Sequence, residues 1–264
     1  MPNPPTRDRS DPPLATPPHW RAGAGISPGT WDYAHRRSIA EGYENFVSTA
    51  AITDYDSRLV AAELPPVRSK DPVWVADLGC GTGRTAVQLA ARGYHVIAVD
   101  LSRPMLDRLG EKGLVHVHPL RSNLVTLDAL AGDCVDHAVC LFATLGMIRG
   151  RTHRIAALTH FRRLVRPGGK LVVHVHHRWA ALSERGGVGS LVQSMVCRDR
   201  ELGDAVYVYR NVGEMFMHRY GRRELIRDLQ RAGWGNQALH RINVAGDGPA
   251  TTYQLAGGFI VVAS

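Results

Sequence analysis

The stretch at residues 73–84 constrains this chain more than any other, because it joins an apolar run to a glycine-rich turn. It reads VWVADLGCGTGR, in which Asp77 closes the apolar run and three glycines follow at alternate positions, namely Gly79, Gly81 and Gly83. The apolar run is typical of a buried strand, and residues 84–91 are typical of a helix. Glycine permits backbone angles closed to other residues and leaves no side chain above the turn, and the helix start offers free N–H groups. The pattern predicts strand, tight turn and helix, with room for a flat nucleoside-like ligand.

Two acidic residues decide which kind of nucleoside such a turn would suit. The dinucleotide fingerprint has the spacing G-x-G-x-x-G, whereas the spacing here is G-x-G-x-G, with Arg84 where the third glycine would fall. Asp77 would repel a pyrophosphate, but it suits a ligand that carries an ammonium and a sulfonium group. A second predicted strand, at residues 95–100, ends in Asp100, whose two oxygens can accept hydrogen bonds from ribose hydroxyls. The residues therefore indicate a nucleoside with acidic contacts and disfavour an NAD-dependent oxidoreductase.

This arrangement resembles the class I S-adenosylmethionine-dependent methyltransferases, and its motifs lie between residues 73 and 169. The resemblance implies S-adenosylmethionine as the cofactor and methyl transfer as the activity. It implies that Asp77 and the glycine turn hold the methionine end of the cofactor, and that Asp100 binds the ribose hydroxyls. Leu101 and Met105 would flank the adenine.

The same resemblance extends the cofactor site to the ends of two further strands. Asn123 stands where the family usually has an Asp that accepts a hydrogen bond from the adenine amino group, and an amide oxygen can also accept that bond. Backbone groups of Phe142 and Ala143 would face the methionine part of the cofactor. The implied cofactor site consists of Asp77, Gly79, Cys80, Gly81, Gly83, Asp100, Leu101, Met105, Asn123, Leu124 and Phe142.

Strand-like and helical stretches alternate along the chain, which predicts βαβ units around a parallel sheet. The expected strands lie at residues 73–77, 95–100, 115–119, 136–142, 170–176, 205–209, 215–220 and 257–263. The expected helices lie at residues 84–91, 102–109, 152–165 and 221–232. We expect an α/β fold with a doubly wound, mostly parallel seven-strand Rossmann-like sheet and helices on both faces. The resemblance adds that the last strand inserts antiparallel, and the strands at 215–220 and 257–263 fit that pair.

Three regions of the chain differ in composition. Residues 1–28 hold 8 of the 15 prolines, so we expect a disordered tail. Residues 29–66 should form a helical lid, with one helix from about Trp31, capped by Thr30, and another at residues 55–63. Trp31, Tyr33 and Tyr43 are the candidates for covering cofactor and substrate, although they could equally pack the segment onto the core. Residues 67–264 should form the methyltransferase domain, with an insertion near 178–211 beside the active site.

Methyl transfer is a displacement at a sulfonium, so a protein mainly has to hold the nucleophile and the methyl group in line. A base is needed only where the acceptor must lose a proton. His176 and His177 stand at the end of a predicted strand and are the candidates, with a purely structural role as the alternative. We expect no metal, because no acid lies near His174, His176 and His177 in sequence and the four cysteines lack a C-x-x-C pair.

The charge of the chain and the absence of two sequence motifs limit which class of methyl acceptor we expect. The formal charge is +8, but only three of the 32 basic residues are lysines, which indicates a coding bias as much as a nucleic-acid surface. The strand at residues 136–142 is not followed by the Asn/Asp-Pro-Pro-Tyr/Phe of amino-group methylases or by a Pro-Cys pair. We expect a small-molecule acceptor with an O, N, S or C nucleophile. An RNA (tRNA) base methyltransferase and a non-methylating nucleoside-binding protein of the same fold remain the alternatives.

The apolar patterning bears on location. No run of 18 apolar residues occurs and the first residues lack a signal-peptide pattern, so we expect a cytoplasmic protein without a membrane partner. The oligomeric state is not predicted by the sequence.

Overall fold

The computed structural model describes residues 23–48, 51–184, 186–197, 199–208 and 214–264. Most of the tail expected at residues 1–28 therefore lies outside the described residues. In the part of the chain that is described, every helix is too short or too polar to cross a bilayer.

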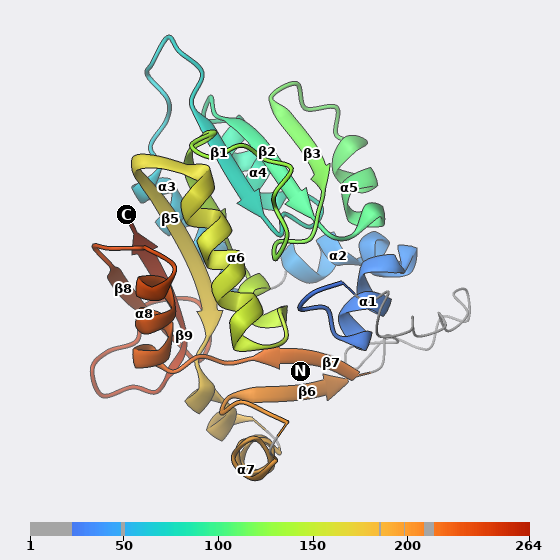
Figure 1. Ribbon diagram of the computed structural model, residues 1–264, viewed down its shortest axis with the longest axis vertical. Helices are drawn as coiled ribbons and strands as arrows, with labels where there is room; N and C mark the ends of the chain where they lie inside the picture. The colour runs from blue at the N-terminus through green and yellow to red at the C-terminus, as the bar shows by residue number, and fades with distance from the viewer. Residues whose placement is uncertain (1–22, 49–50, 185, 198, 209–213) are drawn as a thin grey trace.

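Seven strands form the central sheet (Figure 1). They are β1 (Trp74–Leu78), β2 (His95–Asp100), β3 (Val117–Arg121), β4 (Val135–Cys140), β5 (Val165–His176), β8 (Ala238–Asn243) and β9 (Ala256–Ala263). Their order across the sheet is β3-β2-β1-β4-β5-β9-β8. The first five strands in that order are parallel, β9 is antiparallel to β5, and β8 is antiparallel to β9. The mostly parallel seven-strand sheet predicted from the sequence is confirmed.

Helices cover both faces of the sheet, because successive side chains of a strand point to opposite sides. On one face α6 (Arg151–Leu164) and α8 (Arg222–Arg231) share a buried core with Ala76 of β1. On the other face α3 (Ala51–Glu63), α4 (Arg84–Ala90) and α5 (Arg103–Gly110) share a second core with the neighbouring Val75. The parallel strands thus have an apolar layer on each side, which explains their nearly continuous apolar sequences.

The helices that precede the sheet begin earlier than expected. Helix α1 (Pro28–His35) starts at Pro28, and its cap is Ser27 rather than Thr30: the Ser27 Oγ accepts a hydrogen bond from the Thr30 backbone N–H at 3.2 Å. Proline favours the first turn of a helix because its fixed backbone angle suits that position and it has no N–H to satisfy. Helix α2 (Arg37–Ser48) follows, and the third helix begins at Ala51 rather than Tyr55.

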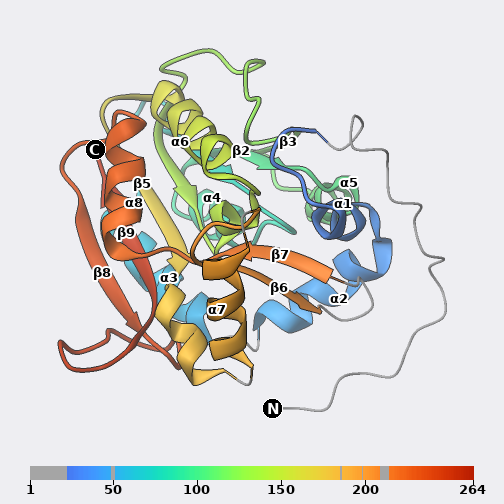
Figure 2. The ribbon, with the colours of Figure 1, turned by 60° about the horizontal axis from the view of Figure 1, so that its bottom comes forward.

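The described elements between residues 178 and 218 form a unit of their own beside the sheet (Figure 2). It consists of the 3₁₀-helix η2 (Arg178–Ser183), helix α7 (Gly187–Val196) and the antiparallel pair β6 (Asp204–Val208) and β7 (Glu214–His218). The assignment of residues 215–220 to the main sheet is therefore wrong. The missing strand is β8, an edge strand whose sequence ALHRIN has no continuous apolar run and gave no clear strand signal.

Two strand boundaries also differ from the prediction for physical reasons. Strand β4 ends at Cys140, because Phe142 and Ala143 adopt positive φ angles of 52° and 62° that cannot continue a strand. Strand β5 begins at Val165 and includes the segment at 166–169 that was expected to be a turn. The pairing with β4 shifts register between Val135 and His137, which accommodates that segment.

Candidate functional site

The glycine turn between β1 and α4 has the left-handed backbone that its sequence requires. The φ angles of Gly79, Gly81 and Gly83 are +83°, +54° and +85°. A Cβ atom on Gly79 would lie 2.2 Å from Cγ2 of Thr144, and one on Gly83 would lie 2.2 Å from Cδ1 of Leu109. Gly79 and Gly81 border a cavity, whereas Gly83 lies outside its lining and permits close packing of α5.

Asp100 joins the glycine turn to the next helix. One carboxylate oxygen accepts a hydrogen bond from the backbone N–H of Gly81 at 2.8 Å, and the other accepts one from Ser102 at 2.8 Å. Burial raises the pKa of Asp100, against the opposing effect of these backbone hydrogen bonds. Because each carboxylate oxygen can accept more than one bond, Asp100 can still receive hydroxyl groups from a ligand in the cavity.

A cavity of about 680 Å³ lies at the carboxyl ends of the parallel strands, within the size range of small-molecule sites. Such a position is where open α/β sheets bind ligands. Among the residues predicted for the site, the cavity is lined by Tyr33, Tyr43, Gly79, Gly81, Asp100, Leu101, Met105, Asn123, Leu124, Phe142 and His176. Most of the predicted positions are thus brought together around one space.

Asp77 lies outside the cavity lining and is only 3% exposed. Burial raises its pKa to about 7, while the charge of Arg84 lowers it and that of Asp100 raises it. Its Oδ2 atom has no hydrogen-bond partner. A buried carboxylate with an unsatisfied oxygen is costly, and a cationic group bound above the turn would stabilise its charged form. This chemistry fits the ammonium of an amino-acid ligand.

Cys80 was expected in the cofactor site but is buried away from the cavity lining. Burial, together with the charges of Asp100 and Asp77, holds the pKa of the thiol well above its ordinary value. The sulfur therefore stays protonated and is a poor nucleophile.

Asn123 lines the cavity, and both ends of its amide already make hydrogen bonds within the protein. The oxygen accepts a hydrogen bond from the Val125 backbone N–H at 3.0 Å, and the amide nitrogen donates to the Ala24 carbonyl at 2.9 Å. The backbone N–H of Arg149 donates to the next carbonyl, that of Gly25, at 2.8 Å. These two bonds hold the segment at residues 23–27 against the cavity, where Gly25 and Ile26 form part of its wall.

The aromatic candidates of the N-terminal helices separate into two groups. Tyr33 and Tyr43 line the cavity, and Tyr43 lies over Gly81, where an added Cβ would be 3.1 Å from the tyrosine ring. Trp31 lies outside the lining and stacks on His35 with ring centroids 3.9 Å apart. Trp31 therefore packs within its own helix and is not part of the cavity wall.

Only one of the two candidate histidines at the end of β5 lines the cavity. His176 is exposed to the cavity, and the protein packed around its ring, together with His174 and Arg219, lowers its pKa to about 3, so the ring is neutral. His177 lies outside the lining: its Nδ1 is 3.0 Å from the Ala256 carbonyl and its ring is 4.6 Å from that of Phe259. Adjacent residues of a strand point to opposite sides, so only one of the pair can reach the cavity.

The half of the cavity beyond the cofactor residues was largely missed by the sequence analysis. Besides His176 it is walled by Thr144 and Met147 of the 3₁₀-helix η1 (Thr144–Met147), by Glu184, Tyr207, Met215 and Met217 of the 178–218 unit, and by Arg219 directly after β7. Arg219 and Glu184 form an ion pair of 2.7 Å. The alternation of Met215 and Met217 with buried Phe216 indicates a strand with two apolar faces, but the sequence does not tell which face meets a ligand.

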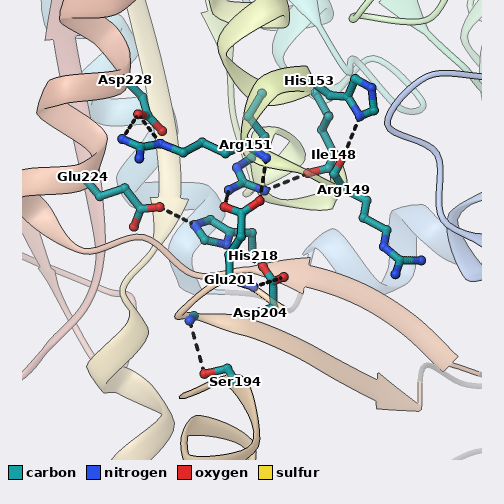
Figure 3. Close-up of polar contacts among 12 residues, drawn as sticks. Ile148, Arg149, Arg151, His153, Ser194, Glu201, Asp204, His218, Glu224 and Asp228 are labelled. Atoms are coloured by element: carbon teal, nitrogen blue, oxygen red, sulfur yellow. Dashed lines mark hydrogen bonds and ion pairs between the residues drawn. The ribbon is translucent and has the colours of Figure 1, made fainter. Parts of the chain in front are cut away.

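A buried ion network anchors β6 and β7 to helices α6 and α8 (Figure 3). Nδ1 of His218 on β7 is 2.7 Å from Asp204 of β6, and its Nε2 is 3.0 Å from Glu224 of α8. His218 thus bridges a carboxylate of β6 and a carboxylate of α8 through its two ring nitrogens. Burial alone would raise the pKa of Glu224, but the hydrogen bond and charge of His218, with Arg178, lower it.

The same network continues through the segment before β6. Glu201 accepts hydrogen bonds from the Arg151 backbone N–H and from the fully buried Arg154 guanidinium, both at 2.6 Å. Arg151 in turn pairs with Asp228 of α8 at 2.6 Å. The unit that walls the second half of the cavity is thereby fixed to the helices of the main fold.

Glu201, His218 and Glu224 place three possible metal ligands within 4.8 Å of one another. Each already has a charged partner, because Arg154 binds Glu201, Arg178 binds Glu224, and Asp204 and Glu224 bind His218. In the whole network four carboxylates pair with three guanidinium groups and one histidine. These pairings already engage the possible ligand atoms, so we interpret the cluster as a structural anchor.

Comparison with known proteins connects this site to methyltransferases. The family described as "Methyltransferase domain" matches residues 75–169. The chain is 30% identical over 170 residues to the ubiquinone/menaquinone biosynthesis C-methyltransferase of Cupriavidus necator, which covers 61% of this chain and 67% of that protein. A stretch of 52 residues is 47% identical to ribosomal RNA small subunit methyltransferase A of Synechococcus sp., covering 20% of this chain and 18% of that protein. The chain therefore spans two thirds of the Cupriavidus protein and less than a fifth of the Synechococcus protein.

A solved structure shares the fold over nearly the whole chain. The 1,6-didemethyltoxoflavin-N1-methyltransferase of Burkholderia thailandensis, with bound 1,6-didemethyltoxoflavin and S-adenosylhomocysteine, is 19% identical. It has a TM-score of 0.59 and covers 98% of this chain and 97% of that one.

Proposed function

We propose that this chain, which belongs to the class I S-adenosylmethionine-dependent methyltransferases, transfers the methyl group of S-adenosylmethionine to a small-molecule acceptor. The observation that carries the proposal is one cavity with two unlike halves. The glycine turn and Asp100 border one half, and a mostly apolar wall with one ion pair borders the other. A nucleoside cofactor and a small acceptor can occupy such a space side by side.

The residues present fit the cofactor of the family. Asp100 would receive the ribose hydroxyls, Leu101 and Met105 would enclose the adenine, and the turn at Gly79 and Gly81 would lie against the methionine part. The buried, unpartnered oxygen of Asp77 supplies negative charge beneath that part. The bound cofactor supplies a methyl group on a sulfonium, and the sulfur part of the cofactor leaves readily as a thioether.

The second half of the cavity would then position the acceptor. We propose that His176, neutral at physiological pH, accepts a hydrogen bond from the nucleophile and orients it. A base with a pKa of about 3 removes protons poorly near pH 7, so orientation rather than deprotonation is the role that its chemistry supports. Tyr207, Met215 and Met217 would enclose an apolar or aromatic body, since methionine adapts to irregular shapes.

RNA is a second candidate acceptor, and the short match to a ribosomal RNA methyltransferase favours it. The acceptor half of the cavity opposes it, because that half presents apolar side chains and a neutralised arginine rather than free cations for phosphates. Salt dependence separates the two cases. An RNA acceptor would bind with an affinity that falls steeply with salt, whereas a small apolar acceptor would not.

The first experiment is calorimetric titration with S-adenosylmethionine, S-adenosylhomocysteine and NAD. Binding of both sulfur ligands without NAD would support the proposal and justify a screen of small acceptors before RNA. Binding of NAD alone would refute it. Binding of the sulfur ligands without methyl transfer to any small molecule or RNA would favour the non-methylating alternative.

A further inference from the structure

Exposed apolar side chains gather in one part of this molecule. Among the described residues twelve large apolar side chains are exposed, and nine of them fall between residues 179 and 208. They are Trp179, Leu182, Val188, Val192, Met195, Val196, Leu202, Val206 and Val208. Single exposed apolar residues are ordinary, but a cluster of this size marks an interaction surface.

Helix α7, which lies beside β6 and β7 in Figure 2, carries four of these nine residues. Its sequence GVGSLVQSMV contains no charged residue. Leu191 and Ser194 face inward and are buried, while Val188, Val192, Met195 and Val196 are 53–72% exposed. The exposed residues have the spacing i, i+4, i+7 and i+8, which places them in one stripe along the helix. An exposed apolar stripe of this kind is normally covered, so it calls for a partner.

We infer that this stripe is the interface of a homodimer, in which α7 packs against α7 of a second copy. The two elements packed against α7, η2 and β6, bring the exposed Trp179, Leu182, Val206 and Val208 to its flanks. A standard interface takes about 800 Å² and 20–30 residues from each partner. The nine exposed apolar residues can form the apolar centre of such an interface.

A second copy fits this surface better than a membrane does. Helices that lie on membranes usually carry Lys or Arg on their polar face, and α7 has none to attract lipid headgroups. An uncharged apolar stripe is complementary to itself, as a two-fold interface requires. Gly189 and Ser190 are small residues of the same helix and would permit a close approach between the two helices.

Dimerisation would also affect the candidate active site. The β6–β7 pair carries Tyr207, Met215 and Met217 on the cavity side, and α7 packs on β6. A partner seated on α7 would therefore support the acceptor wall from outside without entering the cavity.

The test is the mass of the full chain by sedimentation equilibrium over a range of concentrations. We expect a dimer for the wild type, and we expect Val192→Glu to raise its dissociation constant at least 100-fold by burying a charge in the interface. The matched control is Val115→Glu, because Val115 is 82% exposed and lies outside the patch. This variant should dimerise like the wild type.

Two readouts keep the result interpretable. Titration with S-adenosylhomocysteine reports whether Val192→Glu is folded, because the cofactor half of the cavity lies in the main domain. A wild-type chain that stays monomeric at all concentrations would overturn the inference, as would a dimer that survives Val192→Glu in folded protein. A monomer that sediments with liposomes would assign the stripe to a membrane instead.

Discussion

The protonation of Asp77 should control cofactor affinity near neutral pH. Its pKa of about 7 means that roughly half of the molecules carry a protonated Asp77 at pH 7. A ligand with an ammonium group favours the ionised form, so the affinity should follow the ionised fraction. The dissociation constant of S-adenosylhomocysteine should therefore rise about tenfold for each pH unit below 7, and about 100-fold between pH 8 and pH 5.

The same shift predicts an effect of opposite sign on stability. The folded-state pKa lies above the ordinary value of 3.8, so the fold binds the proton more tightly than the unfolded chain does. Stability should fall as pH rises from about 4 to 7, and the ionised carboxylate should cost the fold on the order of 4 kcal/mol above pH 7. Asp77→Asn should therefore raise the melting temperature at pH 8 while it weakens cofactor binding and removes its pH dependence.

The assay is calorimetric titration from pH 5 to pH 8 in buffers of different ionisation enthalpy, which also counts the protons released on binding. Methylthioadenosine is the ligand control, because it lacks the ammonium group and should show a weaker pH dependence. Asp107→Asn is the protein control, since Asp107 is exposed on α5. Equal affinity of the wild type for S-adenosylhomocysteine at pH 5 and pH 8 would refute the reasoning.

Three further variants test other parts of the structure. Asp100→Asn keeps the shape of the side chain but removes its charge, and it should weaken S-adenosylhomocysteine binding 30- to 100-fold, about 2–3 kcal/mol for a charged hydrogen-bonding group; unchanged affinity in calorimetry would remove Asp100 from the site. Glu224→Gln should destabilise the fold at neutral pH by about 3–5 kcal/mol in denaturant titration, because it removes the charged partner of the largely buried Arg178 and one of the two carboxylates on His218. Since the pKa of Glu224 is lowered, this contribution to stability should disappear as the pH falls below the ordinary value of 4.5. The control variant Glu111→Gln changes an exposed residue and should change stability by less than about 1 kcal/mol. An equal loss of stability in both variants would argue against the anchor. Arg219→Met should leave S-adenosylhomocysteine affinity unchanged and raise the KM of whichever acceptor the screen finds, whereas a loss of cofactor affinity would place Arg219 against the cofactor instead.

The cofactor half of the site could be predicted because its residues follow one another along the chain. Parallel strands bring their carboxyl ends to one edge, so an acid such as Asp100 at the end of an apolar run can be located from sequence. The face on which a side chain lies was harder to predict. His176 and His177 are adjacent and chemically alike, and only the strand register sends one to the cavity and the other to Ala256.

The acceptor half could not be predicted, because it depends on contacts between segments far apart in sequence. Glu184 and Arg219 are 35 residues apart, and their ion pair carries no sequence signature. The network around His218 shows the same difficulty, since Glu201 reaches Arg154 across 47 residues and Asp228 reaches Arg151 across 77. The role of Asn123 in holding Ala24 also depends on a contact across 99 residues.

Two walls of the cavity are held in place by contacts of different strength, which indicates where ligands enter and leave. The β6–β7 wall is fixed to α6 and α8 by charged groups, and moving it would separate Glu201 from the buried Arg154 and His218 from Glu224. The segment at residues 23–27 is held by two hydrogen bonds, from Asn123 to Ala24 and from Arg149 to Gly25. Ligands should therefore enter and leave the cavity past the segment at residues 23–27, and the β6–β7 wall should stay in place during turnover.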